Sequence, residues 1–229
     1  LPNLMTIGAT WDTENARKVG IVLGRELRAQ GINFLIGPSL DVLDTIRVDN
    51  SDNLGVRTFG GDPFWVGEMG KAYIQGVHEG GANHIAVIAK HFPGQGESDR
   101  KPEEEIATVR KSLEQLKQIE LAPFLAVTGN ADGFMDQADG LLVSHIRYQG
   151  FQGNIRATTK PISFDATALN LILTLPELES WHTSGGLIVS DDLGSQAVRK
   201  FYDPLNNSFD AKQIARNALL AGNDLLFMG

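Results

Sequence analysis

Residues 84–91 read His84-Ile-Ala-Val-Ile-Ala-Lys90-His91, a near-continuous apolar run that ends in two polar side chains. Such a run is typical of a parallel strand buried on both faces. A second run of this kind, Gly186-Leu-Ile-Val-Ser-Asp191-Asp192, also ends in polar residues. We therefore predict a parallel sheet whose strands carry polar side chains at their carboxyl ends.

Similar runs alternate with helical periods along the whole chain. Strands are predicted over 34–40, 84–90, 140–145, 161–165, 186–192 and 223–228, of which 161–165 has the weakest pattern. About six strands separated by helices, with no run of hairpins, indicate an α/β fold with right-handed crossovers. A doubly wound sheet and a barrel both fit this pattern, and both place ligands at the carboxyl ends of the strands.

The helices have recognisable ends. One is predicted from Thr13 to a C-terminal cap at Gly31, and another starts at Asp62-Pro63, where an N-cap precedes a proline. The predicted buried stripe of the second helix comprises Val66, Tyr73 and Val77. Further helices are predicted over 166–175, over 211–221 and over 106–116, where Arg110 and Lys111 would lie on a solvated face.

Composition excludes several classes of function. The 229 residues contain no cysteine, which leaves no disulfide framework and no cysteine nucleophile or metal ligand. A formal net charge of -8 argues against a nucleic-acid partner. No apolar run approaches the roughly 18 residues of a membrane span. None of these observations fixes a cellular compartment.

Three polar groups are candidates for chemistry. Side chains alternate along a strand, so only one of Asp191 and Asp192 can face a barrel mouth unless the strand has already ended; a turn with a helix cap explains the pair equally well. Lys90 and His91 precede a Pro- and Gly-rich loop and could bind the hydroxyls of a polar ligand. Arg57 lies in a loop, where a surface role and a ligand role both stay open.

Five segments carry a family resemblance. In order they are GPSLDV (37–42), GVRTFGGDP (55–63), AKHFPGQG (89–96), LLVSHI (141–146) and LIVSDDLG (187–194). Their order and spacing resemble glycoside hydrolase family 3, most closely its bacterial β-N-acetylhexosaminidase branch, over essentially the whole chain.

The resemblance implies a (β/α)₈ barrel and a retaining mechanism through a covalent glycosyl-aspartate. It makes Asp191 the nucleophile and assigns Arg57, Lys90 and His91 to sugar binding. Asp41 and His145 match recurrent positions near the pocket. No metal or organic cofactor is implied, and the partner is a carbohydrate substrate.

The sequence departs from the family in the loop that supplies the acid/base. That branch carries an Asp-Ser-His element, whereas this chain has Lys101-Pro102-Glu103 at the corresponding place. Glu97, Asp99 and Glu103 are candidate replacements. Alternatively, Glu103 to Glu105 enrich the first turn of the next helix, where acidic residues complement the helix dipole. In other branches a separate C-terminal domain supplies the acid/base, and the parent chain could carry one.

The resemblance also implies two further βα units before residue 1. We therefore expect residues 1–229 to be a single barrel domain that is truncated at its N-terminus. Exposed strand edges favour aggregation, so we expect this chain alone to fold poorly or to be inactive.

Two hypotheses of function follow, with a third less favoured. The first is a retaining, exo-acting β-glycosidase for terminal β-N-acetylglucosamine or β-glucose. The second is a non-hydrolytic sugar-binding relative that keeps Asp191, Lys90 and His91 and has lost its acid/base. The third, a phosphate-binding barrel enzyme, fits the βα pattern but lacks a glycine-rich phosphate loop.

Overall fold

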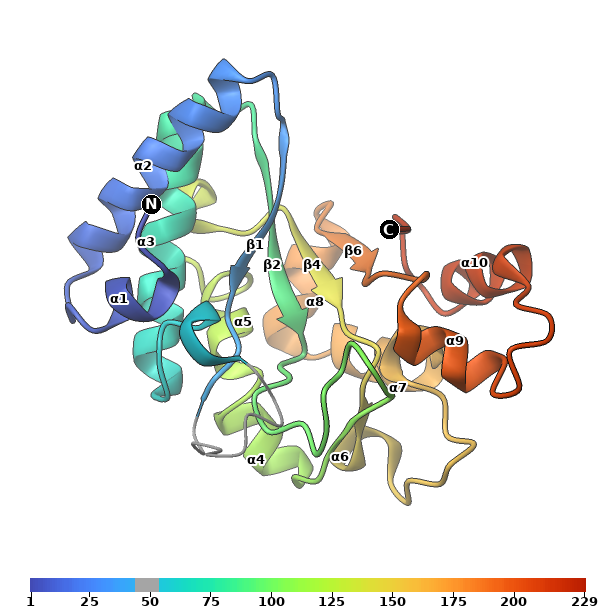
Figure 1. The fold of residues 1–229 in the computed structure, drawn as a ribbon. Coiled ribbons are helices and arrows are strands. Elements are labelled where there is room, and N and C mark those ends of the chain that lie inside the picture. Colours follow the sequence, from blue (N-terminus) through green and yellow to red (C-terminus); the bar gives the residue numbers. More distant parts are fainter. Residues whose placement is uncertain (44–53) are drawn as a thin grey trace.

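The protein is an α/β molecule built around a parallel sheet. The computed structural model describes residues 1–43 and 54–229, so part of the predicted polar loop over 41–61 lies outside the described residues. Within them, one four-stranded sheet has the order β1-β2-β4-β6, formed by β1 (Phe34–Ser39), β2 (Ala86–Phe92), β4 (Gly140–Val143) and β6 (Leu187–Ser190). Every pairing in it is parallel. In Figure 1 the arrowheads of β1, β2 and β4 point the same way, toward a common set of loops.

The two faces of the sheet differ. Val87, Leu141 and Ile188 belong to the main hydrophobic core that the helices build on one face. On the opposite face Ile88, Leu142 and Val189 form a smaller apolar cluster, against which Phe34 and Ile36 pack. This division follows from the alternation of side chains along each strand.

The two long helices form as predicted. Helix α2 (Thr13–Ala29) is followed by Gly31 at φ +74°, and α3 (Pro63–Gly81) starts at Asp62, whose carboxylate accepts a hydrogen bond from Trp65 N at 3.1 Å. The predicted stripe of α3 is buried: Val66, Tyr73 and Val77. Figure 1 shows α2 and α3 running side by side along one flank of the sheet.

The strand predicted over 161–165 is wrong. Residues Ile162–Phe164 form a 3₁₀ turn, η3, and Asp165 caps α7 (Ala166–Leu173) by accepting from Ala168 N at 3.1 Å. The short apolar run serves as the entry to a helix, and all three residues of the turn are buried. The strand predicted over 223–228 is reduced to one parallel bridge, between Val189 and Leu225.

The helix predicted over 106–116 is also wrong. Its first part is a short strand, β3 (Thr108–Val109), which pairs in parallel with β5 (Arg147–Tyr148). Helix α4 (Leu113–Gln118) begins only after Ser112, which forms a capping box with Gln115. Lys111 is consequently buried, with 7 % of its surface exposed, and does not lie on a solvated face.

The remaining elements are short helices. They are α1 (Leu4–Gly8), η1 (Gly55–Arg57), α5 (Ala122–Ala126), η2 (Phe134–Asp136), α6 (Gln149–Gln152), α8 (Pro176–Thr183), α9 (Gln196–Tyr202) and α10 (Ala211–Leu220). Among the described helices, none combines the length and the apolar character needed to cross a bilayer.

Candidate active site

A pocket of about 330 Å³ collects polar side chains from four of the motifs. Its lining comprises Arg57, His91, Gln95, Pro102, Glu103, His145, Asp191, Asp192, Ser195 and Gln196. Five of the predicted site residues therefore meet in one place, although they are far apart in the sequence. These residues lie at or after the carboxyl ends of β1, β2, β4 and β6, where parallel sheets place ligand sites.

Asp191 directly follows β6. Its backbone N–H donates to Val143 O at 3.0 Å, so it continues the ladder one residue beyond the strand. Val189 lies on the face opposite the main core, and Asp191, two residues later, continues that face. One of its carboxylate oxygens, Oδ1, accepts from Asp192 N at 2.8 Å. This local contact holds the carboxyl group at the pocket.

Asp192 has a structural task. Its Oδ1 accepts hydrogen bonds from Gly194 N at 2.8 Å and from Gly229 N at 2.9 Å. Asp192 therefore shapes the turn after β6, as the turn interpretation of the pair suggested. The helix-cap part of that interpretation is wrong, because the side chain of Ser195 caps α9 (Gln196–Tyr202) by accepting from Val198 N. Within the described residues the carboxylate of Asp191 accepts one hydrogen bond, whereas that of Asp192 accepts two.

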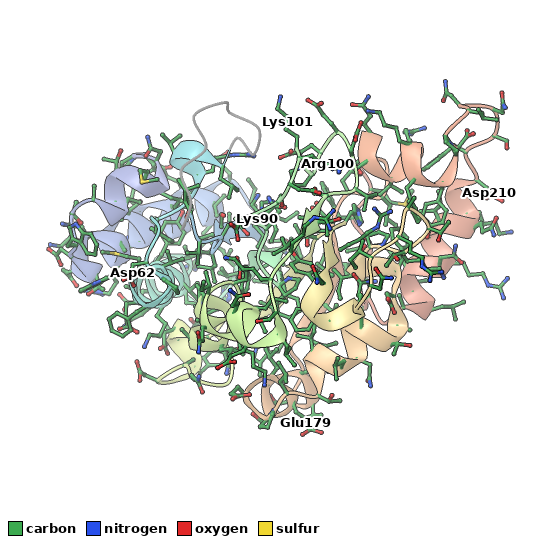
Figure 2. All side chains as sticks on the ribbon, turned by 90° about the horizontal axis from the view of Figure 1, so that it is seen from below. Asp62, Lys90, Arg100, Lys101, Glu179 and Asp210 are labelled. Carbon is green, nitrogen blue, oxygen red and sulfur yellow. The ribbon has the colours of Figure 1, made fainter. Side chains whose placement is uncertain are left out.

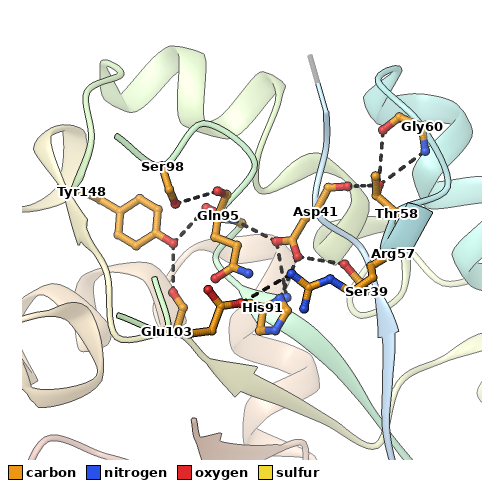
Figure 3. A network of polar contacts seen from close by, with 12 residues as sticks. Ser39, Asp41, Arg57, Thr58, Gly60, His91, Gln95, Ser98, Glu103 and Tyr148 are labelled. Carbon is orange, nitrogen blue, oxygen red and sulfur yellow. Dashed lines mark hydrogen bonds and ion pairs between the residues drawn. The ribbon is translucent and has the colours of Figure 1, made fainter. Parts of the chain in front are cut away.

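Asp41 and His91 form a buried pair beside the pocket. Asp41 is fully buried and accepts from His91 Nδ1 at 2.7 Å, from Gln95 N at 2.9 Å and from the Ser39 hydroxyl at 2.8 Å (Figure 3). Burial alone would raise the pKa of Asp41, but the charge of His91 and these hydrogen bonds outweigh it and lower the pKa overall. Asp41 thus orients the imidazole of His91, whose other nitrogen stays available to the pocket.

Lys90 lies next to this pocket but does not line it. It lines a neighbouring cavity of about 320 Å³ on the side of β1, and Arg57 and His91 line both cavities. Figure 2 views the molecule from below and shows Lys90 near the middle of the view. Lys90 therefore lies beside the other predicted binding residues, but it lines a different cavity from Asp191.

His145 is hydrogen-bonded to the turn that contains Asp191 and Asp192. Its Nε2 lies 3.0 Å from Asp192 O, and its Nδ1 lies 2.7 Å from the Ser163 hydroxyl. Burial lowers the pKa of His145 below its ordinary value, against the opposing pull of Asp191 and Asp192. A neutral ring then donates from Nε2 to the carbonyl and accepts at Nδ1 from Ser163.

The structure distinguishes the three candidate acids of the loop. Glu97 is 3.0 Å from Lys111 Nζ, and Asp99 accepts from Thr108 N at 2.8 Å while pairing with Arg100 at 3.0 Å. Neither lines the pocket around Asp191. Both carboxylates are anchors of the loop.

Glu103 is the third candidate, and it does line this pocket. Its side chain is 55 % exposed, and Oε1 lies 3.4 Å from Arg57 Nη2 (Figure 3). Residues 103–105 lie in a turn and a bend, so the alternative in which they form the first turn of a helix is wrong. The turn leaves the Glu103 side chain free to face the pocket.

Sequence reasoning missed several residues of the site. Gln95 stands inside the recognised AKHFPGQG segment and lines the pocket, and Ser195 and Gln196 follow LIVSDDLG directly. Their positions next to the motifs were an available signal. Tyr148 gave no signal, although its hydroxyl donates to Gly94 O at 2.8 Å (Figure 3). Among the described residues, no group of three His, Asp or Glu side chains is arranged to hold a metal ion.

Comparison with known proteins identifies the family. The model of the glycosyl hydrolase family 3 N terminal domain matches residues 1–229. The chain belongs to glycoside hydrolase family 3. The resemblance read from the five segments is therefore confirmed at the level of the family.

Relatives in family 3 share about three residues in ten with this chain. A β-hexosaminidase from Hydrogenovibrio crunogenus is 29% identical over 215 residues, which cover 94% of this chain and 52% of that protein. A β-hexosaminidase from Idiomarina loihiensis is 30% identical over 213 residues, which cover 93% of this chain and 54% of that protein. The chain thus spans about half the length of the curated relatives it matches.

Solved structures of family 3 proteins share the fold. A family 3 β-N-acetylglucosaminidase from Paenibacillus sp. superposes with a TM-score of 0.78 at 27% identity, covering 98% of this chain and 37% of that one. The shared architecture extends over nearly the whole of this chain.

Proposed function

We propose that this family 3 chain carries the catalytic site of a retaining β-glycosidase that removes terminal β-N-acetylglucosamine units. The observation that carries the proposal is that two carboxylates from different segments, Asp191 and Glu103, line one polar pocket. Most retaining glycoside hydrolases use such a pair. The names of the β-hexosaminidase and β-N-acetylglucosaminidase relatives favour N-acetylglucosamine over glucose.

In the first step a carboxylate oxygen of Asp191 attacks the anomeric carbon. The bond from that carbon to the leaving oxygen breaks, and Glu103 transfers its proton to this oxygen. In the second step the Glu103 carboxylate takes a proton from water, the water oxygen attacks the anomeric carbon, and the bond to Asp191 breaks. Arg57, His91 and Gln95 supply hydrogen bonds to sugar hydroxyls from the same wall, and Lys90 acts from the adjoining cavity.

We also propose that residues 1–229 belong to one (β/α)₈ barrel domain. The parallel order β1-β2-β4-β6, the bridge from Val189 to Leu225 and the pocket at the carboxyl ends of the strands support it.

The nucleophile is tested by trapping. The full-length protein, an Asp191→Asn variant and a control Asp132→Asn variant are incubated with a 5-fluoro β-N-acetylglucosaminide that has a dinitrophenyl leaving group and keeps the acetamido group at C2. Asp132 is an exposed residue paired with Lys71 and lies outside the pocket. The intact mass should rise by one glycosyl unit in the parent and in the control, and not in Asp191→Asn. A well-folded parent that binds sugar but forms no adduct would instead support the non-hydrolytic relative.

The acid/base is tested by the dependence on the leaving group. Glu103→Gln should slow an alkyl glycoside by about 10²- to 10⁴-fold, because its leaving oxygen must be protonated. A dinitrophenyl glycoside needs little protonation, so its glycosylation step should change far less. The matched control is Glu104→Gln, a neighbouring residue of similar exposure that does not line the pocket. Equal effects of Glu103→Gln on both substrates would contradict the assignment.

A further inference from the structure

A buried ionic cluster lies under the loop that follows β2. Lys111 Nζ is 2.6 Å from Glu120 Oε1 and 3.0 Å from Glu97 Oε2. The exposed fractions of the Lys111 and Glu120 side chains are 8% and 0%. Buried ion pairs contribute little net stability compared with well-packed apolar side chains, because each charge loses its hydration. This cluster therefore adds little net stability, and its main effect is to hold neighbouring segments in place.

The cluster joins the loop to the helices below it. Glu97 stands in the loop between Gln95 and Glu103, whereas Glu120 lies between α4 and α5. Gly94, at φ +116°, packs so closely on Glu120 that a Cβ added to it would lie 2.7 Å from the Glu120 Cβ. The Lys111 ammonium thus binds one carboxylate of the loop and one of the supporting layer.

Other contacts fix the same stretch of the loop. Gly94 O accepts from the buried Tyr148 hydroxyl at 2.8 Å, and Gln95 N donates to Asp41 at 2.9 Å (Figure 3). Gly96 approaches Val42 O so closely that any side chain would collide with it. The loop is therefore anchored in the protein interior along residues 94–97.

Glu103, in contrast, has weak anchors of its own. Its side chain is half exposed and its contact with Arg57 is long, at 3.4 Å. Its carbonyl accepts from Ala197 N at 3.2 Å. The position of the Glu103 carboxyl relative to Asp191 is consequently set by the path of the loop, and acid catalysis is sensitive to displacements of about 1 Å.

We infer that Lys111, together with Glu97 and Glu120, is a positioning residue that fixes the loop so that Glu103 reaches the leaving oxygen. This inference rests on the proposed function, in which Glu103 is the acid/base. Lys111 itself does not line the pocket.

The test compares the full-length protein with two variants, each chosen to disturb the cluster without unfolding the protein. The double variant Lys111→Met with Glu120→Gln removes both buried charges at nearly constant volume. Glu97→Gln removes a partly exposed carboxylate and keeps the Lys111–Glu120 pair. Both should lower kcat for the alkyl glycoside by about tenfold or more, with KM little changed, while the glycosylation rate with the dinitrophenyl glycoside falls by less than about threefold.

The matched control is Lys101→Met, which breaks the exposed pair with Glu104 in the same loop. It should leave both rates unchanged. If the double variant does not fold, Glu97→Gln decides alone. Equal losses on both substrates, or no loss on either, in a variant with wild-type thermal unfolding would overturn the inference.

The two proposals fail in different ways. If Glu103→Gln shows no dependence on the leaving group, the acid/base assignment fails and the positioning role with it. If Glu103→Gln shows that dependence and the Lys111 and Glu97 variants do not, only the positioning role fails.

Discussion

At the scale of single residues, Asp41 illustrates how a side chain outside the chemistry controls the site. It is fully buried, and four donor groups from three of the described residues converge on its carboxylate. Removing the charge would leave those donors facing an amide that can accept at only one atom. The orientation of His91 and the start of the loop after β2 both depend on this one group.

Asp41→Asn is expected to destabilise the protein by on the order of 3 kcal/mol at neutral pH, because it takes a buried carboxylate away from several hydrogen-bond donors. Since the pKa of Asp41 is lowered by folding, its contribution to stability is present above the unfolded pKa and is lost as the pH falls through the folded pKa. Urea unfolding at neutral and acidic pH should therefore show a gap between parent and variant that shrinks in acid.

The control for that experiment is Asp132→Asn, at an exposed ion pair with Lys71. Its effect should stay within about 0.5 kcal/mol, as for most surface pairs. A variant at Asp41 that behaved like this control would contradict the structural role of the buried carboxylate.

At the scale of elements, α2 and α3 pack with their backbones almost in contact. A Cβ on Gly20 would lie 2.3 Å from Tyr73 O, and one on Gly76 would lie 2.1 Å from Arg17 O. Gly24 and Gly80 make similarly close approaches. Glycines four residues apart on both helices thus allow an interface that no side chain could enter.

Gly76→Ala is expected to lower the free energy of unfolding by roughly 1–3 kcal/mol, because the added methyl group forces the two backbones apart. Alanine would otherwise favour the helix by about 1 kcal/mol, so the steric cost is larger than the expected net loss. Gly70→Ala, in the same helix, is the matched control, because its nearest neighbour is the flexible side chain of Leu40. A Gly76 variant more stable than the Gly70 variant would contradict the close packing.

The wrong helix prediction over 106–116 has a tertiary cause. Over 106–116 the apolar residues recur at helical spacing, yet β5 offers a pairing partner to residues 108–109 and Ser112 caps a later helix. A period of apolar residues cannot distinguish these outcomes over so short a stretch. The tertiary partner decides.

At the scale of the whole molecule, the two ends of the sheet carry different tasks. The carboxyl ends hold the pocket, and the amino ends hold a pair between the buried His78 and the partly exposed Asp139. His78 Nε2 is 3.0 Å from Asp139 Oδ2, which also accepts from Val87 N at 2.7 Å. This network ties α3 to the start of β2 and β4, far from the proposed chemistry.

This pair should give stability a dependence on pH. Burial would lower the pKa of His78, but the hydrogen bonds to Asp139 and Met135 and the nearby acidic charges outweigh it and raise the pKa. The stabilising contribution is therefore complete below the unfolded pKa of about 6.5 and is lost as the pH rises through the folded pKa.

His78→Gln should accordingly be less stable than the parent near pH 6, and the difference should narrow toward about pH 9. Thermal unfolding measured across this range checks the prediction. His84→Gln, at an exposed residue, serves as the control and should run parallel to the parent. A His78 variant whose deficit is constant or grows with pH would exclude the linkage.

The sequence by itself determined the α/β class, the long helices with their caps, and the segments that carry the site. Buried parallel strands and capped helices leave strong local patterns, and Arg57, His91 and Asp191 stand within recognisable motifs. The structure places those three in one pocket.

Only the tertiary structure decided which acid of the loop faces Asp191 and why Lys111 is buried. Glu97, Asp99 and Glu103 are all acidic residues of the same loop, and the sequence does not separate them. In the structure Glu97 pairs with Lys111, Asp99 accepts a hydrogen bond from the backbone of β3, and Glu103 lines the pocket. Those partners come from segments distant in sequence. Long-range packing, which leaves no local pattern in the chain, therefore separates a candidate acid/base from an anchor.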